Sequence, residues 1–167
     1  MQHLIRRTER LVLRRPENTD QGFVEKLFAF PELVAHRPVP ITDTPEQSAK
    51  RLTEDLQHWQ EHGFGRWAVE AEGKLVGFGG VTVSKQFHAL NLSYHFHPQA
   101  WGRGYATELV GETLSFAFKE LNATTVIGLV RSANPASRRV LEKTGFIFQR
   151  EVMLHNAPTN LFVAQRP

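Results

Sequence analysis

The sequence contains no cysteine among its 167 residues. That absence excludes disulfide bonds, a thiolate nucleophile and any zinc site built on cysteine ligands. No stretch approaches the ~20 consecutive apolar residues that a membrane-spanning helix needs. The opening residues "MQHLIRRTERLVLRR" also lack the apolar run of a secretory signal peptide. We therefore expect a cytoplasmic protein that does not insert into a membrane.

Charge of one sign is not concentrated anywhere along the chain. The sequence has 20 Lys and Arg against 17 Asp and Glu, a formal net charge of +3, and the two kinds are interspersed. Proteins that bind nucleic acids usually gather their basic residues into a stripe. The composition therefore argues against a nucleic-acid partner and favours a small anionic ligand. A chain of this length is expected to form one domain, residues 1–167.

The first part of the chain predicts one strand and two helices. The apolar periodicity indicates a strand at 10–15, a helix at 18–30 and an ordered, proline-containing loop at 31–43. The clearest helix is expected at 45–62, where Thr44 is the capping residue and Gln47 completes a capping box. Gly63 is expected to end this helix.

The rest of the chain alternates strands with two helices. The pattern predicts a hairpin of 66–71 and 75–83, a strand at 90–97, a helix at 104–119, a strand at 124–130, a helix at 135–143 and a closing hairpin of 146–154 and 160–165. The order β-α-α-β-β-β-α-β-α-β-β indicates an α+β fold, a mixed sheet with helices on both faces. A doubly wound dinucleotide fold would alternate more regularly and carry its glycine motif earlier.

Two glycines lie at the start of an otherwise good helix, in the stretch "QAWGRGYATE" at 99–108. A glycine turn between a strand and a helix exposes unpaired N–H groups at the positive end of the helix dipole, and such groups bind anions. Arg103 adds positive charge. The dinucleotide fingerprint is excluded because Thr107 stands where its third glycine belongs, and the P-loop pattern is absent.

The motif Q/R-x-x-G-x-G/A at this place resembles the acetyl-coenzyme A pyrophosphate motif of the GNAT acetyltransferase superfamily, and Gln99, Gly102, Gly104 and Ala106 match it. The later block "NPASRRVLEKTGF" resembles the family's asparagine-containing helix. "TERLVLRRP", "GRWAVEAEGKLVGFGGV" and "YHFHPQAWGRGYATE" resemble the ribosomal-protein N-terminal (RimJ/RimL-like) branch. The resemblance spans the chain and implies a GNAT-type central mixed sheet of about seven strands, splayed in the middle and flanked by about four helices.

The resemblance also implies acetyl-CoA as the cofactor. Its pantetheine arm would pair with the backbone of His95 and Phe96, and a backbone N–H near Phe96 would stabilise the oxyanion. The amides from Trp101 to Ala106 would hold the pyrophosphate. The cofactor-binding residues implied in this way are Phe96, His97, Gln99, Trp101, Gly102, Arg103, Gly104, Tyr105, Ala106, Asn134 and Ser137. The basic residues Arg138, Arg139 and Lys143 either meet the 3′-phosphate of the cofactor or are simply solvated.

Catalysis would need assistance to the departing thiolate. Many members of the family carry a tyrosine seven residues after the asparagine, where this chain has Leu141. Ser137, three residues after Asn134, is the available hydroxyl, and a thiol with a pKa of about 8.5 leaves readily. The alternative interpretation is that Ser137 caps its own helix.

A base for the amine is harder to assign. Relatives often have a glutamate where this chain has Asn91, and asparagine cannot accept a proton. His95 lies on the same strand face and titrates near neutrality. Through water it could deprotonate an α-amine of pKa ~8 more easily than a lysine at ~10.4. The alternative is a half-exposed strand histidine. His95 and His97 share a face but lack a third ligand, so we expect no metal.

The function implied by the resemblance is N-acetyl transfer directly from acetyl-CoA to a primary amine. A protein or peptide N-terminus is favoured as acceptor, with a small-molecule amine as the alternative, and the chain is expected to be a monomer or homodimer. The segments 31–44, 45–62 and the closing hairpin around "LHNAPTN" should form the acceptor pocket. Leu141 and Asn91 leave open a second hypothesis, a non-catalytic acyl-CoA-binding or sensing module.

Overall fold

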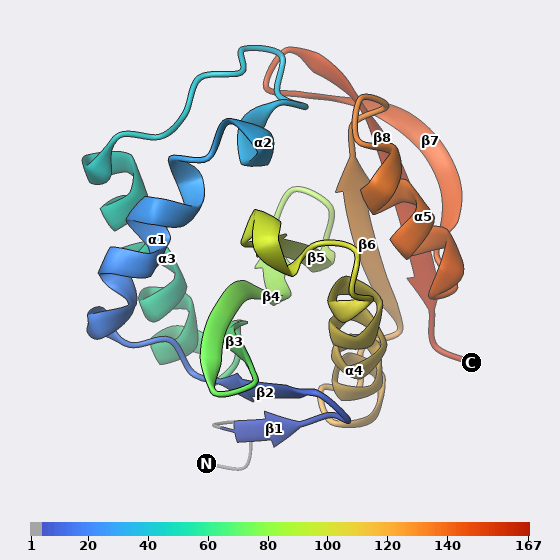
Figure 1. The fold of residues 1–167 in the computed structure, drawn as a ribbon. Coiled ribbons are helices and arrows are strands. Elements are labelled where there is room, and N and C mark those ends of the chain that lie inside the picture. Colours follow the sequence, from blue (N-terminus) through green and yellow to red (C-terminus); the bar gives the residue numbers. More distant parts are fainter. Residues whose placement is uncertain (1–4) are drawn as a thin grey trace.

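The computed structural model describes residues 5–167 (Figure 1). The expectation about a signal peptide concerns in part residues 1–4, which lie outside the described residues. The strands are β1 (Ile5–Arg7), β2 (Leu11–Arg14), β3 (Arg66–Ala71), β4 (Lys74–Ser84), β5 (Ala89–Phe96), β6 (Thr125–Val130), β7 (Ile147–Leu154) and β8 (Ala157–Gln165). The helices are α1 (Gln21–Phe28), α2 (Pro31–Val34), α3 (Pro45–His62), α4 (Tyr105–Lys119) and α5 (Pro135–Lys143), with 3₁₀ turns η1 (Asn18–Asp20) and η2 (Pro98–Ala100).

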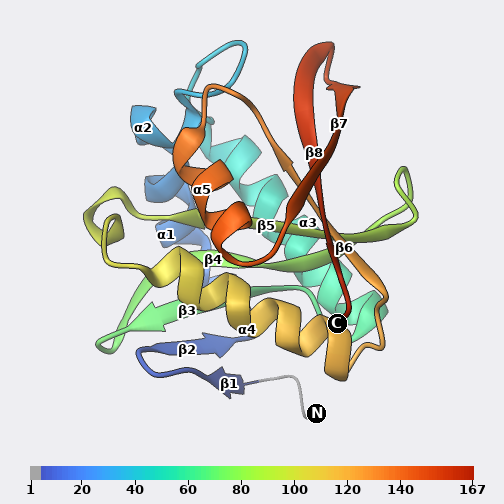
Figure 2. The same cartoon turned by 90° about the vertical axis from the view of Figure 1, so that its right-hand side faces the viewer.

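The strands form one mixed sheet in the order β1-β2-β3-β4-β5-β6-β8-β7. Helices α1 and α3 lie on one side of this sheet, and α4 and α5 lie on the other (Figures 1 and 2). Trp59 and Trp67 are buried, as expected of core residues. The described part of the chain contains no helix long and apolar enough to cross a membrane. The predicted α+β architecture is therefore confirmed.

Two elements were not predicted. The sheet gains an eighth strand because β1 pairs antiparallel with β2, with Arg6 opposite Leu13. Helix α2 forms inside the segment expected to be a loop. Pro31 takes the first helical position there, and Leu33 and Val34 are buried against the α1–α3 layer. A single helical turn is too short to show apolar periodicity, which explains why the sequence did not reveal it.

The helix ends agree with the capping signals. Thr44 and Gln47 form the expected capping box at the start of α3, and Gly63 ends that helix with a left-handed φ of 76°. At the start of α5, the side chain of Asn134 accepts a hydrogen bond from the N–H of Ser137.

The sheet is split between β5 and β6, the parallel pair at its centre. The two strands pair only from Leu90–Val126 to Leu92–Gly128. Beyond Leu92, β5 continues as far as Phe96 in register with β4. The second half of β5 therefore keeps one neighbour and leaves its other edge open. This is the splay that the family resemblance implied.

Candidate functional site

The glycine turn between η2 and α4 presents bare backbone next to the open edge of β5. Gly102 and Gly104 have left-handed φ angles of 76° and 80°, and Gly104 is the capping residue of α4. A Cβ at Gly102 would meet no atom within 4 Å, and one at Gly104 would approach the Arg10 guanidinium at 3.3 Å. The first N–H groups of α4 have no partner within the helix. The turn therefore has the form of an anion cradle.

Arg10, from the segment before β2, holds this turn in place. Its Nη1 donates to the carbonyl of Arg103 at 2.6 Å, and its Nε donates to Glu108 at 2.8 Å. The N–H of Trp101 donates to the carbonyl of Pro98 at 3.1 Å. Of the amides predicted to hold the pyrophosphate, the one of Trp101 is thus already engaged. The amides of Gly102, Arg103 and Gly104, in contrast, have no hydrogen-bond partner within the described part of the chain.

The backbone of Phe96 faces the gap between β5 and β6. The N–H of His97 donates to Val76 of β4 at 2.8 Å, so the groups of Phe96, one residue earlier, point away from β4. The indole N–H of Trp101 donates to the Phe96 carbonyl at 2.8 Å. The carbonyl of His95 points toward β4, where a Cβ on Gly77 would lie 2.4 Å from it. This geometry favours Phe96 over His95 for pairing with a ligand in the gap.

Ser137 lies at the gap and contacts a residue that the sequence did not single out. Its Oγ accepts a hydrogen bond from the hydroxyl of Tyr94 on β5 at 3.2 Å, while Asn134 Oδ1 accepts from its N–H at 3.3 Å. Burial raises the pKa of Tyr94, and the hydrogen bond with Ser137 lowers it less. The Tyr94 hydroxyl therefore stays protonated at neutral pH. Leu141 is 4% exposed and packs in the core.

His95 points to the opposite side of the sheet, toward α1 and α3. Its Nδ1 lies 3.0 Å from Nη2 of Arg66, and its ring contacts the ring of Phe28 edge-on, with centroids 4.9 Å apart. Burial lowers the pKa of His95 well below its usual value, and nearby cations, Arg66 first, lower it further. Because a guanidinium can only donate, Nδ1 accepts and Nε2 carries the hydrogen. In this arrangement His95 is neutral and presents a donor.

His97 and Asn91 take different positions on that side. The Nδ1 of His97 accepts from the N–H of Gln99 at 3.1 Å, and its ring lies 4.7 Å from that of Phe30. His97 thus caps η2. The Asn91 Oδ1 is buried and has no hydrogen-bond partner among residues 5–167. Within residues 5–167, no group of three His, Asp or Glu residues is arranged to hold a metal ion.

The basic residues of α5 are all exposed. Arg138 pairs with Glu142 at 3.4 Å and lies over the ring of Phe162, 5.4 Å from its centroid. Arg139 and Lys143 extend from the same helix. The geometry leaves both interpretations of this surface open.

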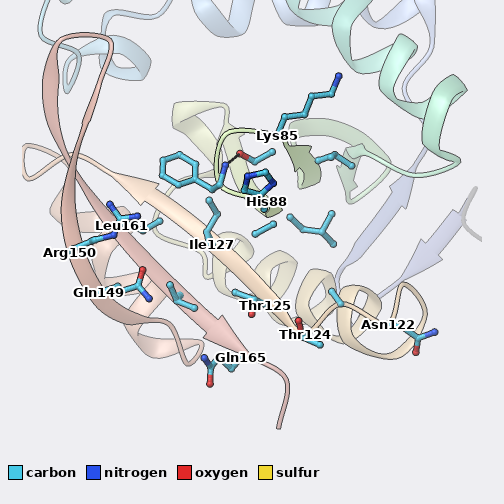
Figure 3. A pocket seen from close by; sticks show the side chains of 17 residues that line it. Lys85, His88, Asn122, Thr124, Thr125, Ile127, Gln149, Arg150, Leu161 and Gln165 are labelled. Carbon is cyan, nitrogen blue, oxygen red and sulfur yellow. Dashed lines mark hydrogen bonds between the residues drawn. The ribbon is translucent and has the colours of Figure 1, made fainter.

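A cleft of about 860 Å³ lies elsewhere, beneath the β4–β5 turn (Figure 3). Leu90 and Ile127 line it at the end of the split sheet where β5 and β6 still pair, together with polar residues such as Lys85 and Gln149. None of the residues predicted to bind the cofactor or to act in catalysis lines this cleft. It is separate from the gap beside the glycine turn.

A sheet that opens in its middle beside a glycine-capped helix is the architecture of an acyl-CoA-dependent acetyltransferase. Residues 10–147 match the model of the acetyltransferase (GNAT) domain, and the chain therefore belongs to the GNAT acetyltransferase family. Members of this family use acetyl-CoA. The chain is an N-acetyltransferase, and the non-catalytic hypothesis is not favoured.

Among its relatives is the uncharacterized N-acetyltransferase YoaA of Bacillus subtilis (strain 168). That protein is 26% identical over 169 residues, which cover 96% of each chain. The solved structures that share the fold include two complexes with coenzyme A. RimL, a ribosomal L7/L12 alpha-N-protein acetyltransferase in complex with coenzyme A, has a TM-score of 0.79 at 12% identity, covering 95% of each chain.

Spermidine N-acetyltransferase of Vibrio cholerae, in complex with coenzyme A and spermine, has a TM-score of 0.77 at 18% identity. The match covers 95% of this chain and 96% of that one. Proteins with very different acceptors thus share the fold. The comparisons support the GNAT family and do not single out the RimJ/RimL branch.

Proposed function

We propose that this protein transfers the acetyl group of acetyl-CoA directly to a primary amine, with a peptide or protein N-terminus as the favoured acceptor. The observation that carries the proposal is the open edge of β5 beside the Gly102–Gly104 turn. Acetyl-CoA supplies the activated thioester. The residues present fit it, because a Cβ at Gly102 would meet only open space, and the first amides of α4 lack partners in the helix.

The open edge of β5 supports binding of an extended ligand arm. The N–H of Phe96 faces the gap, and such a donor can stabilise the oxyanion that develops when an amine attacks a thioester, an effect of ~3 kcal/mol. The Phe96 carbonyl is fixed by Trp101, so this part of the backbone is oriented before the ligand arrives.

Ser137 is proposed to assist the departing sulfur. Tyr94 donates to Ser137 Oγ, which leaves the serine hydroxyl hydrogen free to point elsewhere. A donated hydrogen bond is sufficient assistance for a leaving thiolate that is already stable near neutral pH. Asn134 and Tyr94 act through Ser137 and are positioning residues in this proposal.

The state of His95 bears on the choice of acceptor. Nδ1 of His95 is hydrogen-bonded to Arg66, and Nε2 carries the hydrogen. In this proposal His95 therefore donates a hydrogen bond to the amine substrate and does not remove a proton from it. An amine that is partly neutral without help is then the better substrate. An α-amine of pKa ~8 meets this condition and a lysine side chain of pKa ~10.4 does not. This argument favours a peptide N-terminus.

The proposal is tested by calorimetric titration with coenzyme A and acetyl-CoA, followed by thiol release against pooled N-terminal peptides and small amines. We expect cofactor binding and thiol release with the peptide pool. Binding without release on any pool would favour the acyl-CoA-sensing alternative. Absence of binding would refute the assignment of the cofactor site.

A further inference from the structure

The side of β5 that faces α1 and α3 carries an unusual concentration of arginine. Arg66 on β3 donates to His95, and Arg51 on α3 lies over the Phe28 ring, 4.2 Å from its centroid, where that ring contacts His95. Arg37 follows α2. The charges of these three arginines and of His36 all act on His95. With Arg131 they make up what we call the arginine face: Arg37, Arg51, Arg66, Arg131 and His36.

The arginine face extends from His95 to the closing hairpin. Arg131, directly after β6, donates from Nη1 to Thr159 Oγ1 of β8 at 3.2 Å. Burial lowers the pKa of His36, and the charges of Arg37 and Arg131 lower it further. The loop after α2, helix α3 and the β7–β8 hairpin are the segments that the sequence assigned to the acceptor pocket. Arg37 lies in the first of these segments, Arg51 lies in the second, and Arg131 contacts the third through Thr159, so the arginine face borders the predicted acceptor pocket.

Two carboxyl groups only partly offset these charges. Asp43 accepts from Arg37 at 2.9 Å and from Arg51 at 2.5 Å. These hydrogen bonds lower the pKa of Asp43 although burial opposes them, so one carboxylate is shared by two guanidinium groups. Asp55 lies near Arg66, and its burial raises the pKa of its carboxyl group. Four guanidinium groups against two carboxyl groups leave the arginine face positively charged.

Arg66 has hydrogen-bonding capacity that the protein does not use. Its Nη2 donates to His95, but its buried Nε has no partner among the described residues. A buried guanidinium donor without an acceptor is costly. A carboxylate held beside the arginine face would stabilise this poorly compensated positive charge electrostatically, because opposite charges attract strongly where water is largely excluded.

From this arrangement we infer that the acceptor carries an anionic group, such as a carboxylate, close to its reacting amine, and that polycationic amines are poor substrates. The inference deepens the proposed function and rests on it. The same chemistry can come from an acidic side chain near a peptide N-terminus or from the α-carboxylate of a free amino acid. A polyamine such as spermidine would bring further positive charge to a face that already carries an excess, and like charges repel.

The test compares kcat/KM for acceptors matched in everything except charge. Three peptides share an N-terminal serine and differ in residues two to four, which are acidic, neutral amide or basic. Free aspartate and spermidine complete the set. We expect the acidic peptide to exceed the neutral one by about tenfold and the basic one by more. The preference should weaken with added salt because the surface charges are screened.

Charge reversal tests the arginine face itself. Arg131→Glu removes the hydrogen bond to Thr159 and should reduce the preference for the acidic peptide at least about tenfold, mainly through KM. Lys119→Glu, a charge reversal at the exposed end of α4, is the matched control and should leave the preference unchanged. Arg51→Gln is a second variant in case Arg131→Glu is poorly folded, and melting curves show whether each variant is folded.

The outcomes separate the two proposals. Turnover that is equal for acidic, neutral and basic acceptors overturns this inference and leaves the proposed function standing. Faster turnover of spermidine also overturns it. Rapid turnover of free aspartate with none of the peptides supports an anionic acceptor and overturns the preference for a peptide. If no acceptor is acetylated although coenzyme A binds, the proposed function fails, and this inference fails with it.

Discussion

The two sides of β5 are built in different ways. The side toward α4 and α5 prepares its site with backbone groups, namely the turn at Gly102 and Gly104 and the open edge at Phe96. The side toward α1 and α3 uses charged side chains instead, from Arg37 to Arg131, drawn from segments far apart in the sequence. A backbone site suits a ligand that every family member shares, whereas a side-chain site can change its charge without altering the fold. In our proposals, acetyl transfer and the choice of acceptor therefore depend on opposite sides of one strand.

The largest effect is expected from Gly104→Trp, which changes only the side of β5 toward α4 and α5. A side chain at this left-handed position would fill the cradle in front of α4 and meet the Arg10 guanidinium. We expect coenzyme A binding to fall below detection in calorimetry. The backbone strain of a non-glycine residue there costs on the order of 1–2 kcal/mol, which a folded domain should survive.

Gly63→Trp is the matched control, because Gly63 has a similar φ of 76°, has open space around it and lies at the end of α3. It carries the same backbone penalty away from the cradle and should bind coenzyme A normally. If both variants bind coenzyme A equally well, the glycine turn is not the pyrophosphate site.

The sequence predicted the backbone features on the α4–α5 side of β5 better than the side-chain contacts on either side, for physical reasons. The glycine turn, the capping box and the asparagine cap each depend on residues that lie two or three positions apart, and the structure has all of them. The Tyr94–Ser137 hydrogen bond joins residues far apart in the chain. Tyr94 lies within the predicted strand 90–97, but nothing near it in the sequence pointed to Ser137.

On the side of β5 toward α1 and α3, the sequence likewise did not predict contacts between distant segments. The alternation placed His95 on the correct face of β5, but nothing local indicated that Arg66, on another strand, would occupy its Nδ1. That contact changes His95 from a candidate base into a donor. Periodicity can indicate the direction of a side chain, and only the assembled sheet shows what it meets.

The next largest effect is expected on the α1–α3 side, where Asp43→Asn should lower the stability of the fold. Asp43 is 5% exposed and links Arg37 to Arg51, so its neutral replacement loses two charge-assisted hydrogen bonds. We expect a loss of about 3 kcal/mol in the free energy of unfolding, measured by urea denaturation. Coenzyme A affinity should be unchanged. In contrast, Glu54→Gln breaks only the exposed pair with Lys50 and should leave the stability unaltered.

A smaller effect is expected on the α4–α5 side, from the two hydroxyl groups at the gap. Tyr94→Phe removes the donor to Ser137, and we expect kcat to fall about tenfold with little change in the KM for acetyl-CoA. Ser137→Ala should lower kcat by at least as much. If the two residues act as one unit, the double variant will be no slower than Ser137→Ala. Fully additive losses would show that Tyr94 acts independently, and an unchanged kcat in Ser137→Ala would return that serine to a purely structural role.

The smallest effect concerns pH and again distinguishes the sides. On the α1–α3 side, burial lowers the pKa of His36, His58 and His95. The unfolded chain, with histidine pKa values near 6.5, then binds more protons than the folded one, so stability is full above this pH and falls as pH decreases below it. On the α4 side, hydrogen bonds from Thr8 and Arg10 outweigh burial and lower the pKa of Glu108, whose contribution is lost only in more acidic solution.

His58 offers a direct check that the α1–α3 side loses stability at mildly acidic pH, because His58 links α3 to the sheet. Its Nδ1–H donates to the carbonyl of Phe64 at 2.8 Å, and its Nε2 accepts from the N–H of Val83 at 3.0 Å. Protonation would abolish the second bond. We expect the melting temperature to fall between pH 7 and pH 5.5, and the fall to be smaller in His58→Gln than in the exposed control His88→Gln. Equal pH profiles in the two variants would mean that His58 does not contribute to the acid sensitivity. The sensitivity of the α1–α3 side would then have to come from His36 and His95.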